Sequence, residues 1–465
     1  MKLSKPTTSR IRTDFAIFNP WSGTLIERLT ETSQLEITST VARARIAAAS
    51  FRNSTPFQRR ELLNSLADLI GRDADTMAQT ICSEMGKTIT EARAEIRRAQ
   101  NTLRLSADAA TFLDGEVLHC GIISGGVDRQ AVVTYVPTGV VAAITPFNYP
   151  VNLLCHKLGP AIAAGNSIVV KPSPKAPLAA DHLVNLTVEA GFPRDLVQIV
   201  HGGADVALGL ARSEIDLLSF TGGGRAGLAL KQASGLVRCL MELGGNDPLI
   251  VMHDADLATA VATATTQRFE IAGQSCAAVK KLYLHSAIES EFTERLLEVV
   301  ANYRHGDPAL PDTQMGPVID ETAAADIISR LLEAQSGGAK LLFGGTRDGV
   351  MVKPTIMSDV GQSTRLFATE TFGPVLALRR FGSLDQVITE LNASAFGLQA
   401  GIFTNDHAAI RNLGRNLQVG GLMVNEGPDF RAEHVPFGGV KGSGLGREGV
   451  RIALREMSET RVVID

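Results

Sequence analysis

Residues 140–170 read VVAAITPFNYPVNLLCHKLGPAIAAGNSIVV, an apolar run followed by a helical stretch and a second apolar run. Residues 140–145 and 166–170 are short and apolar, which is typical of buried strands. Residues 157–164 have helical spacing, and a second helix is expected over residues 179–190. Strands that alternate with helices predict a parallel sheet covered by helices on both faces, which is an α/β fold.

A helical region precedes this alternation and a second alternation follows it. Residues 40–113 carry apolar positions at helical spacing, and residues 216–221 form one more strand before a triple glycine and a helix. After Glu242 a second set of strands is expected, at residues 248–251, 281–284, 340–343 and 422–425. We therefore expect a second α/β domain that starts near Leu243.

Two segments stand apart from both alternations. Residues 120–127 are rich in glycine and precede a strand at 131–136, which favours a hairpin that leaves the main body. Residues 461–464 are typical of a strand, but no obvious local partner strand lies next to them in the sequence.

The bulk composition narrows the function classes. The chain has 465 residues, too many for one compact core, so two or three domains are expected. The net charge of -4 with interspersed signs predicts neither a nucleic-acid partner nor a membrane surface. No run of about 18 apolar residues is present. The polar residues 1–12 lack the apolar centre of a signal peptide.

The cysteines favour a reducing compartment. Five are present, with wide spacing and no Cys-x-x-Cys pair: Cys82, Cys120, Cys155, Cys239 and Cys276. A disulfide framework and a metal site are therefore not expected, and the cytoplasm is the predicted location. Most such cysteines are small buried hydrophobes. Cys276 differs because its neighbours in Gly273-Gln274-Ser275-Cys276-Ala277-Ala278 are small and mostly uncharged.

Cys276 and Glu242 supply the two parts of thioester chemistry. A cysteine thiolate attacks a carbonyl, and a carboxylate base serves the thiol and then the hydrolytic water. Glu242 is followed by Leu243-Gly244-Gly245, which predicts a tight turn beside a site. No charged residue flanks Cys276, so activation is expected from a base, a cationic cofactor ring or backbone dipoles.

Asn148 is a candidate oxyanion donor. It stands in Pro146-Phe147-Asn148-Tyr149-Pro150, where the prolines fix the backbone and remove local amide donors. Its side-chain amide and the backbone amide of Cys276 could hold the oxyanion together. The loss of such a donor typically costs about 3 kcal/mol in the transition state.

Two further segments point to a nucleotide. Lys171 follows the strand at 166–170, so it faces the crevice where ligands bind in open sheets. Residues 222–227, GGGRAG, fit G-x-G-x-x-G between a strand and a helix, which would place a pyrophosphate at the helix N-terminus. That motif would also make Glu242 a ribose ligand rather than a base.

Four segments in this order resemble the aldehyde dehydrogenase superfamily, and the resemblance runs from about Ile11 to Asp465. They are residues 146–150, 242–246, 269–279 and 370–374, the last of which reads Glu370-Thr371-Phe372-Gly373-Pro374. The chain looks closest to the branch of lactaldehyde, non-phosphorylating glyceraldehyde-3-phosphate and phosphonoacetaldehyde dehydrogenases. In this family the glycine segment is usually Gly-Ser-x-x-x-Gly. The fit to G-x-G-x-x-G thus arises from Gly224, and Glu242 is interpreted as the base.

The resemblance implies the architecture. It predicts a Rossmann-like cofactor domain over residues 1–115 and 137–242 and a catalytic α/β domain over residues 243–438. Residues 116–136 and 439–465 are expected to form a small β oligomerisation element, because the family builds its subunit interface from such a hairpin and tail. A homodimer or homotetramer is the expected assembly.

The resemblance also assigns roles. Cys276 becomes the nucleophile, Glu242 the base and Asn148 the oxyanion donor. NAD or NADP is the expected cofactor, with Lys171 at the adenosine ribose, Glu370 at the nicotinamide ribose and Phe372 beside the ring. The full expected cofactor set is Thr145, Pro146, Phe147, Lys171, Ser173, Gly222, Gly223, Gly227, Leu243, Glu370 and Phe372.

Two departures from the family bear on the cofactor. Gly223 replaces a hydroxyl residue that usually binds phosphate, so that contact is lost or made by backbone. Pro174 stands where NAD-preferring members often have a glutamate that repels a 2′-phosphate, and Lys175 follows it. We therefore expect NADP to be tolerated or preferred.

The substrate is expected to be a short aldehyde with an anionic or strongly polar head, such as a phosphonate, phosphate or carboxylate. Arg98, Tyr149 and Arg431 match the branch named above, and arginine grips anions as a planar fork. Ser275 replaces an arginine that often precedes the nucleophile in anion-binding members, which favours a smaller or differently placed anion. A lactaldehyde-like or general enzyme for neutral aldehydes is the alternative.

Two rival functions are disfavoured by the residues present. Relatives that pass the acyl group to coenzyme A generally lack a glutamate at the position of Glu242. A non-catalytic scaffold with this fold would be expected to have lost the catalytic set, whereas Cys276, Glu242, Asn148, Lys171 and Glu370 are all present.

Overall fold

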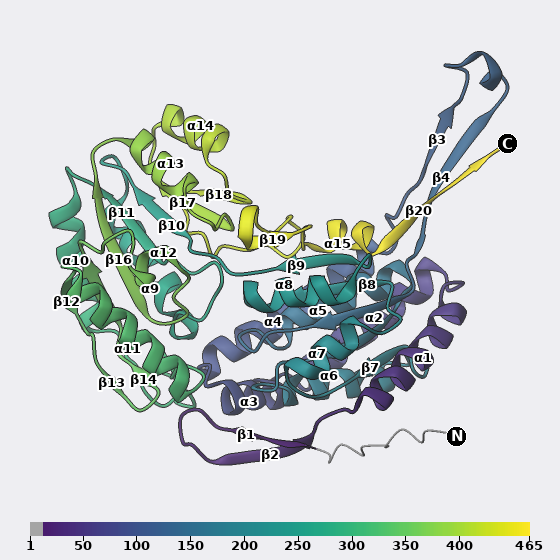
Figure 1. Ribbon diagram of the computed structural model, residues 1–465, viewed down its shortest axis with the longest axis horizontal. Helices are drawn as coiled ribbons and strands as arrows, with labels where there is room; N and C mark the ends of the chain where they lie inside the picture. The colour runs from purple at the N-terminus through teal and green to yellow at the C-terminus, as the bar shows by residue number, and fades with distance from the viewer. Residues whose placement is uncertain (1–12) are drawn as a thin grey trace, which may run out of the picture.

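The computed structural model describes residues 13–465, so the expectation about residues 1–12 lies outside the described part. Two open sheets with their helices form the body, and a three-stranded arm projects from it (Figure 1). The predicted α/β class is confirmed. Within residues 13–465, no helix is both long and apolar enough to span a bilayer.

The first sheet has six strands and contains the alternation predicted from residues 140–170. All neighbouring strands are parallel except the short edge strand β19, which is antiparallel to β9. In spatial order the strands are β19 (Gly444–Leu445), β9 (Arg238–Glu242), β8 (Leu217–Thr221), β5 (Val140–Ile144), β6 (Ser167–Lys171) and β7 (Val197–Ile199).

Alternate residues of β5 enter two different cores. Val140, Ala142 and Ile144 belong to one buried cluster, while Val141 and Ala143 belong to another. Both sets are buried because helices cover both faces, and side chains of a strand alternate between faces. This explains the continuous apolar run in the sequence.

Nine helices supply these two cores. The sequence sets where three of them begin, because a capping box precedes α1 (Gln34–Phe51), α2 (Pro56–Arg72) and α4 (Ile89–Ala109). One face is covered by α2 (Pro56–Arg72), α3 (Ala74–Met85), α4 (Ile89–Ala109), α5 (Asn152–Ala164), α6 (Leu178–Glu189) and α15 (Val450–Glu456). The other face is covered by α1 (Gln34–Phe51), α7 (Ala204–Ala211) and α8 (Gly224–Ser234).

The predicted helices and strands of this part are confirmed, with one shifted boundary. Helix α5 begins at Asn152, five residues before the expected start at residue 157. Every residue of α5 is buried, so the helix has no polar face whose spacing could mark its first turn.

The second sheet has seven strands and its own core. It is parallel except for the edge strand β12, and four of its strands were predicted from the sequence. In spatial order the strands are β12 (Lys340–Phe343), β15 (Thr355–Ser358), β16 (Val375–Phe381), β11 (Lys281–His285), β10 (Pro248–Val251), β17 (Gln399–Phe403) and β18 (Gly421–Val424). Its helices are α9 (Leu257–Phe269), α10 (Glu289–Ala301), α11 (Glu321–Ser336), α12 (Arg365–Ala368), α13 (Leu384–Asn392) and α14 (His407–Asn416).

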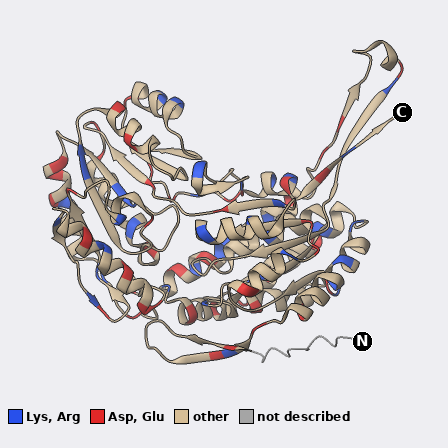
Figure 2. Cartoon of the chain, in the orientation of Figure 1, with Lys and Arg blue, Asp and Glu red and all other residues tan. Residues whose placement is uncertain are grey.

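The projecting arm consists of β3 (Glu116–His119), β4 (Gln130–Pro137) and the C-terminal strand β20 (Ser458–Ile464). The predicted hairpin is confirmed, and β20 finds its partner in β4, to which it is antiparallel over its whole length. Charged side chains of both signs occur on the arm as well as over the body (Figure 2). A second hairpin, β1 (Asp14–Phe18) with β2 (Leu25–Thr30), was not anticipated from the sequence.

Candidate active site

A cavity of about 460 Å³ opens at the carboxyl ends of the first sheet. Ile144 ends β5 and Thr145 follows it, Lys171 ends β6, Thr221 ends β8 and Leu243 follows β9, and all of these residues line the cavity. The carboxyl ends of parallel strands meet at one edge, which is where open α/β sheets bind ligands. Residues from the second sheet's side, including Cys276 and Glu370, complete the wall.

Almost all of the residues singled out in the sequence meet at this cavity. Those on the wall are Arg98, Thr145, Pro146, Phe147, Asn148, Tyr149, Lys171, Ser173, Gly222, Gly223, Leu243, Cys276, Glu370, Phe372 and Arg431. Two do not line the wall, namely Glu242 and Gly227. A Cβ at Gly227 would come within 2.6 Å of Leu243, so this glycine gives Leu243 room rather than contacting a ligand.

One end of the cavity has the chemistry of a dinucleotide site. The N-terminus of α8 follows Gly223, whose position is open, with nothing within 4 Å of an added Cβ. The free amides of such a terminus attract phosphate. Lys171 is buried nearby, and burial lowers its pKa to about 8. The hydroxyl of Thr145 is buried on the wall without a partner among the described residues. These groups fit NAD or NADP.

Glu370 and Gly244 lie close together on the cavity wall. The Glu370 carboxylate accepts a hydrogen bond from the Gly245 amide at 3.2 Å. A Cβ at Gly244 would come within 2.3 Å of the Glu370 Oε2 atom, so only glycine allows this approach. Burial raises the pKa of Glu370, although the buried Lys280 3.9 Å away opposes the shift.

Pro174 and Lys175, where the chain departs from the family, lie differently relative to the cavity. Pro174 lies on the cavity wall, where it contributes no charge. Lys175 is not part of that wall, because its amino group forms an ion pair with Asp320, the cap of α11. Lys175 therefore leaves this part of the cavity without a countercharge to a 2′-phosphate.

The loop before Cys276 adopts a backbone that few residues favour. Ile271 and Ala272 have φ of 53° and 52°, and Gly273 has 71°. For the two non-glycine residues this costs roughly 1–2 kcal/mol each. Glu91, which also caps α4, accepts a hydrogen bond from the Ile271 amide at 2.8 Å and so holds the turn. The buried guanidinium of Arg268 donates to the carbonyls of Gly273 and Gly373.

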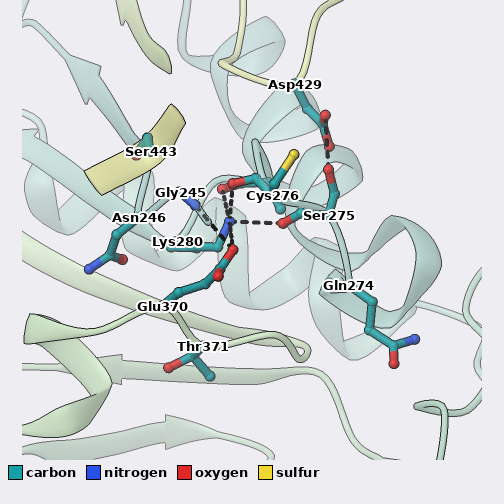
Figure 3. A network of polar contacts seen from close by, with 12 residues as sticks. Gly245, Asn246, Gln274, Ser275, Cys276, Lys280, Glu370, Thr371, Asp429 and Ser443 are labelled. Atoms are coloured by element: carbon teal, nitrogen blue, oxygen red, sulfur yellow. Dashed lines mark hydrogen bonds and ion pairs between the residues drawn. The ribbon is translucent and has the colours of Figure 1, made fainter. Parts of the chain in front are cut away.

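Lys280 holds the other side of the same loop (Figure 3). Its buried ammonium donates to the carbonyl of Ser275 at 2.8 Å and to the carbonyl of Cys276 at 2.6 Å. The backbone on both sides of the nucleophile is thus fixed, which leaves the thiol of Cys276 as the movable part. Burial raises the pKa of Cys276, and the negative charge of Asp429 adds to the rise.

Asn148 lies beside the nucleophile loop. Its side-chain amide is buried and donates to the carbonyl of Gln274 at 2.9 Å, two residues before Cys276. One N–H of this amide therefore fixes the side chain and the second stays available. A fixed amide with one available N–H beside the nucleophile loop is the arrangement that an oxyanion donor needs.

Glu242 lies behind the wall in a buried charge network. Burial raises its pKa well above the usual range, and the charge of Glu448 raises it further. Burial also opposes ionisation of Glu448, but Lys157 and Arg431 hold its pKa below the usual range. Lys157 donates to Glu448 at 2.9 Å and Arg431 at 3.0 Å. Glu242 itself has a buried Oε2 atom without a hydrogen-bond partner among the described residues.

The far end of the cavity carries the substrate candidates. The Nε atom of Arg98 donates to Glu433 at 2.7 Å, and no hydrogen bond of its two terminal nitrogens is found within residues 13–465. The guanidinium of Arg98 also lies 5.6 Å from the ring centre of Tyr149. Arg431 is paired with Glu448, so both arginines already have a carboxylate partner.

Several wall and support residues were missed from the sequence. Ser275 is interpreted from the sequence only as a departure from the family, and Asp429 is not singled out there, yet both line the cavity. Lys280, Glu433 and Glu448 lie behind it. The spacing of Lys280, four residues after Cys276, was the one local signal available. The two glutamates are recognised only through partners distant in the sequence.

The chain is similar to known proteins over nearly its whole length. The model of the aldehyde dehydrogenase family matches residues 7–463. A sulfoacetaldehyde dehydrogenase from Neptuniibacter caesariensis is 39% identical over 451 residues, which cover 97% of this chain and 99% of that protein. A 3-sulfolactaldehyde dehydrogenase from Priestia aryabhattai is 40% identical over 412 residues, covering 88% and 86%.

A solved structure is similar over its whole length. Glyceraldehyde-3-phosphate dehydrogenase GapN from Methanocaldococcus jannaschii, complexed with NADP, superposes with a TM-score of 0.94 at 33% identity. The match covers 98% of this chain and 99% of that one. The chain belongs to the aldehyde dehydrogenase family and is an NAD(P)-dependent aldehyde oxidoreductase.

Proposed function

We propose that the protein oxidises a short aldehyde with an anionic or polar head to the carboxylic acid through a thioester on Cys276. The observation that carries the proposal is one continuous wall. It joins Cys276 and Asn148 to the dinucleotide residues at one end and to Arg98 at the other. NAD or NADP would be held by Lys171, Glu370 and the N-terminus of α8.

The first half of the reaction uses Cys276 and Asn148. The Glu242 carboxylate takes the thiol proton and passes it to solvent, and the sulfur forms a C–S bond to the aldehyde carbon while the C=O π electrons move to oxygen. The Asn148 amide and the Cys276 backbone N–H stabilise that oxyanion. NAD or NADP, held by Lys171, Glu370 and the N-terminus of α8, would supply the hydride acceptor that conversion to the thioester requires.

The second half uses Glu242. Ionised Glu242 removes a proton from water, the water oxygen bonds to the thioester carbon and the C–S bond breaks. The carboxylic acid leaves and the cysteine recovers its proton. Burial and the charge of Glu448 raise the pKa of Glu242, which makes its carboxylate a stronger base than an exposed glutamate.

The arginines support the choice of head group. Glu433 binds only the Nε of Arg98, so it orients the fork and leaves both terminal nitrogens for a ligand. The names of the sulfoacetaldehyde and 3-sulfolactaldehyde relatives point to the same kind of substrate, a short aldehyde with an anion. Tyr149 and Arg431 would complete this end of the pocket.

NADP is proposed to be used at least as well as NAD. Pro174 brings no carboxylate to the adenosine end, so nothing at this position repels a 2′-phosphate. The similar GapN structure was solved with NADP. Because Lys175 is engaged by Asp320, the proposal rests on absent repulsion rather than on an added cation.

Assembly as a homodimer or homotetramer is also proposed, with residues 116–136 and 439–465 as the association element. The first α/β domain would then comprise residues 1–115 and 137–242, and the catalytic domain residues 243–438. A cytoplasmic location is favoured because the five cysteines are all unpaired.

The test compares two aldehydes of equal shape. Sulfoacetaldehyde and its neutral isostere 3,3-dimethylbutanal are assayed for kcat/KM with saturating NAD and then NADP, with and without coenzyme A. A preference of at least a hundredfold for the anion, about 2.7 kcal/mol, is expected, as is independence from coenzyme A. Equal use of the neutral aldehyde would favour a general enzyme. Cys276→Ala serves as the inactive control.

A further inference from the structure

Asp429 is a buried carboxylate on the cavity wall that the reaction above does not use. It lines the same cavity as Arg98 and Arg431, and its carboxylate contacts the hydroxyl of Ser275, the residue before Cys276. Figure 3 shows its carboxylate and the Cys276 thiol on the same side of the nucleophile loop. Burial raises the pKa of Cys276 most, and among the nearby charges that of Asp429 raises it most.

Only half of this carboxylate is satisfied. The Oδ1 atom accepts a hydrogen bond from the Ser275 hydroxyl at 3.1 Å, and the Asp429 backbone amide donates to Gln267 at 2.9 Å. The Oδ2 atom is buried and has no partner among the described residues. A buried carboxylate oxygen without a donor is costly, so a ligand that supplies the donor gains from the contact.

The position of Asp429 limits where that donor can be on the substrate. The aldehyde carbon must bond to the Cys276 sulfur, so the substrate atoms nearest to Asp429 are those next to the carbonyl. We propose that Asp429 is a specificity-determining residue that accepts a hydrogen bond from a hydroxyl on the carbon adjacent to the aldehyde. The inference rests on the proposed aldehyde oxidation and names its substrate class, the 2-hydroxyaldehydes.

The surrounding charges favour a neutral hydroxyl over an ammonium group. Burial raises the pKa of Asp429, and three cations, Lys280, Arg98 and Arg431, oppose that rise. An ammonium on the same carbon would be a fourth cation in a buried space. A hydroxyl supplies the donor without added charge, and it leaves Arg98 for the head group.

The test measures selectivity rather than rate alone. For wild-type protein with saturating cofactor, kcat/KM is determined for each enantiomer of 2-hydroxypropanal and for propanal. At least a tenfold preference for one hydroxyl enantiomer over propanal is expected, because a fixed acceptor distinguishes the two hands. In Asp429→Ala, both the hydroxyl preference and the enantiomer difference should fall to within about twofold. The change in the Cys276 environment affects all three aldehydes alike and cancels in the ratio.

Two controls separate specificity from structure. Ser275→Ala removes the other partner of Asp429 and should keep the enantiomer preference. Asp429→Asn retains an acceptor oxygen and should keep part of it, with an unchanged melting temperature as the check on folding. A wild type that oxidises propanal and both enantiomers equally, or an Asp429→Ala variant that stays enantioselective, overturns the inference and leaves aldehyde oxidation standing. A wild type that oxidises no aldehyde overturns the proposed function itself.

Discussion

Glu242 depends on a neighbour that is itself part of a charge network. Burial raises the pKa of Glu242, and the ionised carboxylate of Glu448 adds to that rise. Glu448 stays ionised because Lys157 and Arg431 both donate to it. The proposed base is therefore tuned through a residue that lies more than two hundred positions away in the sequence.

This coupling predicts a shift in the pH profile. Glu242 accepts a proton only when it is ionised, so hydrolysis increases as the pH rises through its pKa. Glu448→Gln removes a negative charge and frees two cations, and both changes lower the pKa of Glu242. The ascending limb of the plot of kcat against pH should move to lower pH by about one unit. It is measured under conditions in which a burst of reduced cofactor shows that thioester hydrolysis limits the rate. Glu27→Gln on the exposed strand β2 is the control, and a limb that stays or moves upward contradicts the coupling.

The residues that sequence reasoning found differ in kind from those it missed. Cys276, Asn148 and Glu242 stand in small, glycine-bearing or proline-bearing segments, and such local patterns can be read along the chain. Asp429 and Glu448 have no local signature. Their roles follow from the partners that folding brings to them, and a single sequence does not contain that information.

Among the secondary-structure elements, a buried strand could be predicted from the sequence, whereas the start of a buried helix could not. The run at residues 140–144 predicted β5 because a strand buried on both faces leaves an unbroken apolar stretch. The same burial hid the start of α5, since a helix surrounded by protein has no polar side to mark its first turn. The hairpin of β1 and β2 is short and largely exposed, so it carried no apolar alternation to detect.

The loop that presents Cys276 is predicted to depend on Lys280. Lys280→Met leaves the Cys276 carbonyl without a donor, at about 1–3 kcal/mol for a buried group, and leaves the Ser275 carbonyl with only the Ala278 amide at 3.4 Å. The loop should loosen, with kcat falling at least tenfold for every aldehyde and Cys276 reacting faster with a thiol reagent. Lys281→Met is the matched control, because this neighbouring buried lysine lies over the Phe367 ring instead. Equal losses in both variants would mean that only general stability had been tested.

At the scale of the molecule, the arm carries apolar surface that the single chain leaves exposed. Val117, Val132 and Val463 are cross-strand neighbours in β3, β4 and β20, and their exposed fractions are 55%, 37% and 55%. Ile122 at the tip is 94% exposed. A projecting sheet with such a row of exposed apolar side chains has a surface suited to a subunit interface.

A charge in the centre of this row should therefore prevent association. Val132→Glu places a carboxylate between Val117 and Val463, where pairing with a second copy would bury it at a cost of several kcal/mol. The wild type is expected to sediment as a dimer or tetramer and the variant as a monomer, at the same protein concentration. Val188→Glu changes a valine on α6 that is 77% exposed, outside the arm, and should leave the assembly intact. Because the arm lies apart from the cavity, a monomeric Val132→Glu variant should still bind NADP. A variant that keeps the wild-type mass would place the subunit contact elsewhere on the molecule.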